Sequence, residues 1–326
     1  MKMIILPRKK FSYAYNGTEY DSIFFGNLLS SNADTDVIDE WYYANEYRYL
    51  DSVKISELNM KYTALKDMPA GHPATSSDWF GEGINSNRMI DNLFTSRSTF
   101  SDDAEITFEI TGMTHLIGQG IDNVRNIKIR YQDSEGNVIY DGFDCDDCNV
   151  KSREINLVAY DSFDCDSCCN PPPQQRTSFF YKFDLPTCEK IAQVSLYFER
   201  YDTTRPMSIA TLAVGRSFDI GCAVSGINIE MNLPKSTIEV RSLRQTGILP
   251  ANIEVSIRGD VIVTKKRIDE IMEVMSRHGN YLNFYILEDD NDVKTGIVLG
   301  RFRRIGAPIS SASRIIMPID IYGILQ

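Results

Sequence analysis

Apolar side chains recur at every second position over much of the chain, and this alternation restricts the fold more than any other feature. Residues 105–111 place Ile, Phe and Ile on one side, and residues 124–131 place Ile, Ile and Tyr there, with mostly polar residues between them. A period of two puts such side chains on one face of a β-strand. The 17 Tyr and 16 Phe residues also favour sheet. The sequence therefore predicts a mainly β protein.

Several packed units are expected, because 326 residues exceed the length at which one hydrophobic core usually divides. We expect an N-terminal arm at 1–40 and a small β module at 41–84. Regularly spaced strand candidates predict a jelly-roll-like β-sandwich with cysteine-rich loops at 85–211. A helix among strands predicts an α+β docking domain at 212–326.

The predicted helix covers residues 264–278. Apolar residues fall on one of its faces with helical spacing, namely Ile268, Ile271, Met272 and Met275. Thr264 is suited to cap the amino end, and a glycine follows the last residue. We expect the apolar stripe to pack on the C-terminal sheet, with a subunit interface as the alternative.

The net charge is −11, from 45 acidic and 34 basic residues. This balance disfavours a nucleic-acid backbone or an anionic membrane surface as partner, because both are negatively charged. No apolar stretch approaches the ~18 residues of a membrane span, so no membrane insertion is expected. Protein partners or neutral sugars fit better, and we expect synthesis in a cytoplasm.

Four cysteines form two short motifs, Cys145-x-x-Cys148 and Cys165-x-x-Cys168, with sixteen residues between them. This spacing is typical of a site in which four thiolates hold zinc. Disulfides and free thiols are the alternatives. The aspartates around both motifs also suit calcium, which prefers carboxylate oxygens.

Four aromatic residues gather in the small module: Trp41, Tyr42, Tyr62 and Trp79. Flat aromatic faces can stack on the apolar face of a sugar ring, so these residues are candidates for a glycan-binding platform. The alternative is that they form the core of the module, because a domain of this size has few other large side chains to bury.

The same stretch resembles the small chitin-binding type of carbohydrate-binding module. The residues that carry the resemblance are Tyr47-x-Tyr-Leu-Asp51-x-Val53, Tyr62-x-Ala64, Gly71-x-Pro73 and Trp79. Asp51 stands where that family usually has glycine, so the first turn is altered. The resemblance implies a surface glycan as partner.

The continuation resembles tail-associated proteins of tailed bacteriophages. It runs Trp79-Phe-Gly-Glu-Gly-Ile-Asn-Ser-Asn-Arg88 with Asp91 following, and residues 214–221 and 318–325 fit the same layout. The resemblance implies a structural component of the virion tail, collar or baseplate region. Its expected partners are other tail proteins and copies of itself in a symmetric ring.

No arrangement typical of catalysis stands out. His72, His115 and His278 do not fall at the spacing of a zinc-protease motif or beside a nucleophile elbow. We therefore expect a structural protein of the virion and not an enzyme. A host-surface carbohydrate-binding protein of the tail is the alternative.

Overall fold

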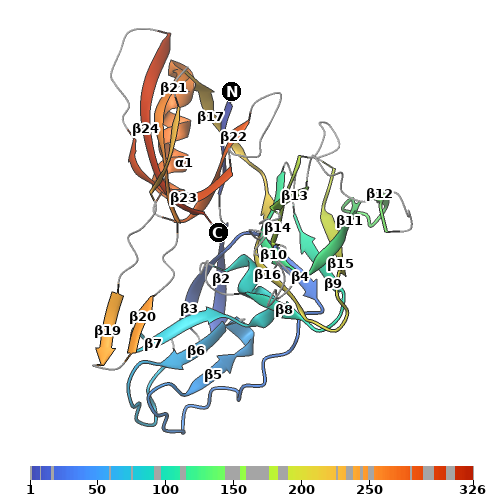
Figure 1. Ribbon diagram of the computed structural model, residues 1–326, viewed down its shortest axis with the longest axis vertical. Coiled ribbons are helices and arrows are strands. Elements are labelled where there is room, and N and C mark those ends of the chain that lie inside the picture. The colour runs from blue at the N-terminus through green and yellow to red at the C-terminus, as the bar shows by residue number, and fades with distance from the viewer. Residues whose placement is uncertain are drawn as a thin grey trace, which may run out of the picture. The chain divides into compact units, whose positions relative to one another are not determined.

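Two units make up the chain in the computed structural model (Figure 1). The barrel unit combines Met1–Arg8 with Arg216–Gln326, and the inserted unit spans Lys9–Gly215. The structure describes residues 2–7, 9–15, 18–58, 60–74, 76–91, 97–110, 115–143, 155–158, 176–182, 190–224, 227–232, 238–242, 245–248, 253–279, 281–288, 297–305 and 313–325. The protein is mainly β, as the alternation predicted.

The barrel unit is an antiparallel sheet that closes on itself. Closure arises because β17, at one end of the strand order, also pairs with β21. The strands around the barrel are β17 (Phe218–Ala223), β1 (Lys2–Leu6), β22 (Asn283–Glu288), β23 (Ile297–Ile305), β24 (Arg314–Leu325) and β21 (Ile253–Thr264). A further strand, β18 (Asn228–Asn232), pairs with β21, and β19 (Ile238–Ser242) pairs with β20 (Gln245–Ile248) in a separate hairpin.

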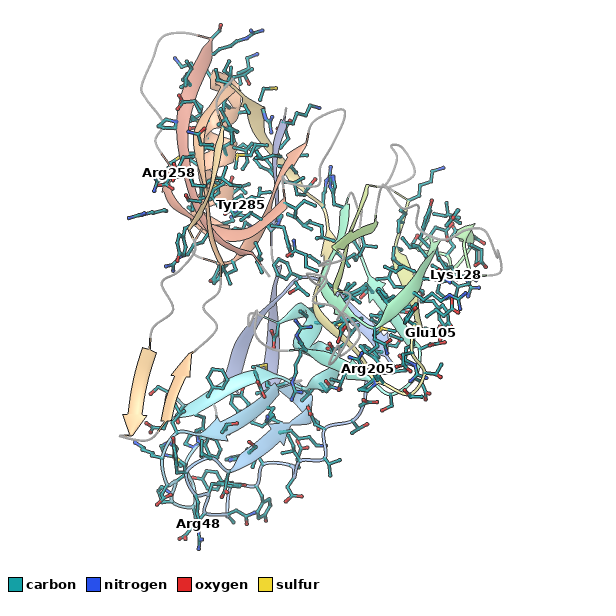
Figure 2. All side chains as sticks on the ribbon, in the orientation of Figure 1. Arg48, Glu105, Lys128, Arg205, Arg258 and Tyr285 are labelled. Carbon is teal, nitrogen blue, oxygen red and sulfur yellow. The ribbon has the colours of Figure 1, made fainter. Side chains whose placement is uncertain are left out.

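Alternate apolar residues of these strands form one buried core. Met3 and Ile5 of β1 meet Met317 and Ile319 of β24 there, and the only α-helix described in this unit, α1 (Ile268–His278), packs against the same core. The predicted α+β character of the C-terminal part is therefore confirmed. In Figure 2, Tyr285 of β22 lies within the barrel and Arg258 of β21 projects from its outer surface.

The helix begins later than its sequence predicted. Thr264 pairs with Arg314 as the last residue of β21, and a 3-10 turn, Lys265–Arg267, follows it. The α-helix starts at Ile268 and has no side-chain cap, so the expected capping role of Thr264 was wrong. Ile271 and Met275 are buried, whereas Met272 is 38% exposed and lies outside the packed stripe.

The inserted unit contains two five-stranded antiparallel sheets. Successive strands β8 to β11 alternate between the two sheets, which is the jelly-roll-like sandwich arrangement that was expected. One sheet has β13 (Ile155–Val158), β14 (Arg176–Lys182), β10 (His115–Asp122), β16 (Met207–Gly215) and β8 (Ser98–Phe100). The other has β12 (Val138–Asp141), β11 (Val124–Gln132), β15 (Gln193–Arg200), β9 (Ala104–Glu109) and β4 (Asn27–Ser31). A 3-10 helix, η2 (Asn85–Ile90), packs against β16 and β8.

The small module is a three-stranded sheet of β5 (Ser52–Ile55), β6 (Met60–Ala64) and β7 (Trp79–Gly83), with a 3-10 turn, η1 (Ser56–Leu58), after β5. Its core consists of buried residues from the strands and from the segments around them, namely Trp41, Val53, Ile55, Leu58, Ala64, Met68, Ala74 and Trp79. The last strand of the sheet ends at Gly83.

Residues 1–40 do not form one arm. Lys2–Leu6 is a strand of the barrel, because its apolar residues fill the barrel core. β2 (Lys9–Tyr15) and β3 (Thr18–Phe24) form a hairpin, and Asn27–Ser31 is an edge strand of the sandwich. The predicted boundary at 211 and 212 also falls inside a strand, since β16 continues to Gly215.

Candidate functional site

The two tryptophans of the small module lie in its core. The side chains of Trp41 and Trp79 are 9% and 5% exposed. The Tyr47 ring packs edge to face against the Trp79 ring, with centroids 5.4 Å apart. The Tyr43 ring packs in the same way against Trp41, with centroids 5.9 Å apart. Tyr62 is half-buried against the same core. Both indole rings are therefore too enclosed to offer an open face to a sugar.

Other tyrosines of the module do face solvent. Tyr42 is 63% exposed, Tyr43 is 62% exposed and Tyr49 is 59% exposed. We refer to residues 42–50 as the tyrosine segment. Of the four aromatic residues predicted from sequence to bind a glycan, only Tyr42 is largely accessible. Sequence reasoning missed Tyr43 and Tyr49. A small core buries its largest apolar rings first, so the two tryptophans were expected inside, and the tyrosines around them were the better candidates for exposed rings.

Hydrogen bonds fix the tyrosine segment. The Tyr47 hydroxyl donates to the Tyr42 carbonyl at 2.9 Å and accepts from the Tyr42 amide at 2.7 Å. The Tyr49 amide donates to the Asp67 carboxylate at 2.8 Å. Leu50 adopts a left-handed backbone conformation with φ of 72°. The exposed rings are thus carried on a backbone that is tied at both ends.

Asp51, which stands where the chitin-binding family usually has glycine, closes this turn. Its carboxylate accepts a hydrogen bond from the Arg48 amide at 2.7 Å. The left-handed residue is its neighbour Leu50, so the position of Asp51 does not itself require glycine. The altered turn is therefore formed with an aspartate in place.

A charged group lies beside the module's last strand. Asp78 contacts the Lys66 ammonium at 2.9 Å and the His72 ring at 3.1 Å. The hydrogen bond from Lys66 is the main cause that holds the pKa of Asp78 below its usual value. In general, exposed aromatic faces can stack on a neutral sugar, and carboxylates and amines can bind its hydroxyls.

The outer face of the second sandwich sheet carries a polar network. Asp103 accepts hydrogen bonds from the Tyr197 hydroxyl at 2.8 Å and from the Arg200 amide at 2.9 Å. Burial raises the pKa of Asp103, but these bonds outweigh it and leave the pKa below its usual value. The bond to Asp103, with some burial, raises the pKa of Tyr197 to about 12.

A second group on this sheet involves Arg130. Its guanidinium contacts both carboxylate oxygens of Asp141, at 3.0 and 2.9 Å, and lies 4.4 Å from the centre of the Phe143 ring. Lys128 and Glu105 lie on the same sheet (Figure 2). Arg130 and Asp141 hold one another, so we assign this group to the stability of the sheet.

The cysteines of the predicted metal or disulfide site, Cys145, Cys148, Cys165 and Cys168, lie outside the described residues. Within the part of the chain that is described, no group of three or more His, Cys, Asp or Glu side chains is placed to hold a metal ion. Cys222 of β17 is an exposed free thiol.

The three histidines lie in separate elements. His72 is in the turn before β7, His115 is buried at the start of β10, and His278 ends α1. Burial, with a contribution from Arg277, lowers the pKa of His278. The structure does not bring these histidines together.

Comparisons with protein-family models, with curated proteins and with solved structures found no match to this chain. Among the described residues, no helix is long and apolar enough to cross a bilayer.

Proposed function

We propose that this chain is a structural, non-enzymatic component of a tailed-phage virion, located in the tail, collar or baseplate region. In this role the barrel unit is the mount that docks among other tail proteins and copies of the chain. The inserted unit is the part that the mount carries. The sequence resemblance to tail-associated proteins supports this proposal.

One observation carries the proposal, namely how the inserted unit is attached. It leaves the barrel after β1 and returns before β17, and these two strands are neighbours in the barrel. Ile5 pairs with Phe218, so both connections start from one place on the sheet. An insertion between adjacent paired strands leaves the pairing of the barrel intact. This attachment suits a rigid base that presents a second unit.

Purified particles test the proposal. Antibodies raised against the inserted unit should label one region of the tail in electron micrographs, and mass spectrometry of the same particles should detect the chain. Particles from a phage in which this gene carries a stop codon provide the control. Absence of the chain from mature particles would refute the proposal, as would turnover of a substrate by the purified protein.

We also propose, as a second candidate, that the inserted unit binds a host-surface glycan. The exposure of Tyr42 and Tyr43 favours this, because two solvent-facing rings sit on a hydrogen-bonded backbone. Tyr42→Ala with Tyr43→Ala should reduce retention on host polysaccharide by roughly tenfold, the size expected for losing aromatic contacts.

The matched control is Tyr201→Ala, because Tyr201 is 71% exposed but lies in the sandwich. Replacing Trp79 would not separate binding from folding, since its ring is in the core. Equal retention of the tyrosine variant and the unmodified chain would refute the glycan proposal.

A further inference from the structure

The two units carry opposite charge. The barrel unit has 16 Lys and Arg against 13 Asp and Glu, which gives +3, and the inserted unit has 18 against 32, which gives −14. The acidity of the whole chain therefore comes from the inserted unit alone. A basic patch on the barrel unit would meet a complementary surface on every other copy of the chain.

The barrel unit has such a patch. A pocket of about 720 Å³ is lined by Gly279, Arg301, Phe302, Arg303 and Tyr322. Phe302 packs its ring edge to face against Tyr285 of the barrel core, with centroids 4.8 Å apart. The residues on either side of Phe302, Arg301 and Arg303, are both exposed. We call Arg301, Arg303 and this hollow the arginine pocket.

The backbone of β23 is irregular at this point. The pairing of β23 with β24 shifts register between Phe302 and Arg304, so Arg303 is the extra residue of a bulge. Gly300 lies opposite Gly323 across the same two strands. A side chain at Gly300 would come within 2.6 Å of the Tyr322 carbonyl, so the close approach of the strands depends on glycine.

The two arginines differ from their neighbour Arg258 in having no acidic partner among the described residues. Arg258, two strands away, contacts Glu230 and Asp320, each at 3.5 Å. Arg301 and Arg303 are exposed and form no ion pair with any described side chain. A guanidinium presents a planar fork that matches a carboxylate, so two of them in a pocket suit an acidic protein surface.

We infer that the arginine pocket of one copy docks onto the acidic inserted unit of a second copy. The contact is heterologous, because the pocket and the acidic surface are different parts of the chain. Repetition of such a contact gives a ring where the rotation closes, and a filament where it does not. This inference rests on the proposed structural role and names the partner that the barrel unit would meet.

Sedimentation velocity of the full chain tests the inference. At about 0.1 M salt the unmodified chain should form species larger than the monomer as concentration rises. These should dissociate towards 1 M salt, where the screening length falls from about 10 Å to about 3 Å. The double variant R301E/R303E should weaken association by roughly tenfold or more. Both residues are exposed, so circular dichroism should show an unchanged fold, and R301Q/R303Q is the milder second variant.

The matched control is Arg314→Glu, which reverses an exposed charge on the same strand as Tyr322 but about 27 Å away along it. It should associate like the unmodified chain. A mixture of labelled R301E/R303E with the unmodified chain should again form dimers, since the variant keeps its acidic unit.

The inference is overturned if the unmodified chain stays monomeric at every concentration and salt, or if R301E/R303E associates as well as Arg314→Glu. It is also overturned if the pocket binds inorganic phosphate while the double variant still associates. These outcomes distinguish a failure of this inference from a failure of the proposed function. A chain present in particles but monomeric in solution removes only this inference, and pocket-dependent association of a chain absent from particles removes only the proposed function.

Discussion

The small module offers the most direct test of how its fold is held, through Leu58→Ala. Leu58 is 1% exposed and belongs to the core that contains both tryptophans. Shortening it to alanine removes buried methyl groups and leaves a cavity beside rings that have little room to move. Neither tryptophan is altered, so both remain as reporters.

The expected cost is large for a unit of this size. A buried Leu→Ala change destabilises by about 2–5 kcal/mol, depending on how far the site can collapse. At roughly 0.05–0.15 kcal/mol per residue, a module of about 44 residues holds only about 2–7 kcal/mol in total. The variant should therefore lose most of the stability of this module.

Tryptophan fluorescence during urea unfolding measures this loss selectively. The chain has two tryptophans, and both lie in this module, so the emission reports on it alone. The midpoint should fall by about 2 M or more, taking an m-value near 1 kcal/mol/M. Tyr42→Ala, at a side chain that is 63% exposed, should change stability by less than about 0.5 kcal/mol. An unchanged midpoint in Leu58→Ala would refute the assignment of the tryptophans to a packed core.

Three further outcomes follow from other parts of the structure. Asp103→Asn should bring the pKa of Tyr197 from about 12 towards 10, seen by ultraviolet titration, and an unchanged titration would contradict the hydrogen bond between them. In the unmodified chain, the contribution of the Tyr197 hydroxyl to folding stability is complete below pH 10 and is lost as pH rises to about 12. The contribution of the Asp103 carboxylate is lost as pH falls below about 4. Melting temperatures measured across this pH range would show both losses. Gly323→Ala should destabilise the barrel by about 1–3 kcal/mol in calorimetry, because its new carbon would lie 2.8 Å from the Leu299 carbonyl, and an unshifted transition would contradict that packing. Ile271→Ala, at a helix residue that is 0% exposed, should cost about 2–5 kcal/mol, and a cost under 0.5 kcal/mol would place α1 outside the core.

Local patterns were enough to predict several of the strands. The alternating stretches at 105–111 and 124–131 overlap β9 (Ala104–Glu109) and β11 (Val124–Gln132), since a period of two is set by neighbouring residues alone. The helix was found for the same reason, but its start was placed too early. Thr264 is a good capping residue, yet its pairing with Arg314 keeps it in a strand. That contact spans fifty residues, so no local rule could show it.

Sequence could not predict the barrel or the candidate sites, because they form through contacts between residues still further apart in the chain. Met3 pairs with Gly221 and with Leu287, so the chain start looked like an arm when only its neighbours were considered. In the small module, sequence identified an aromatic cluster but could not say which rings face outward. The arginines of β23 are close together in the sequence, but the pocket that they line lies beside a bulge and beside glycines from two strands, which local sequence does not reveal.

The place of β1 in the barrel also bears on how the chain is made. Its strand partners, β17 and β22, are synthesised more than two hundred residues after it. At about 5–20 residues per second, the apolar run Met3–Leu6 waits roughly ten seconds to a minute on the ribosome for them. The inserted unit emerges complete during that interval. A nascent chain stopped before β17 would leave its first strand without either partner, and is the form we expect to aggregate.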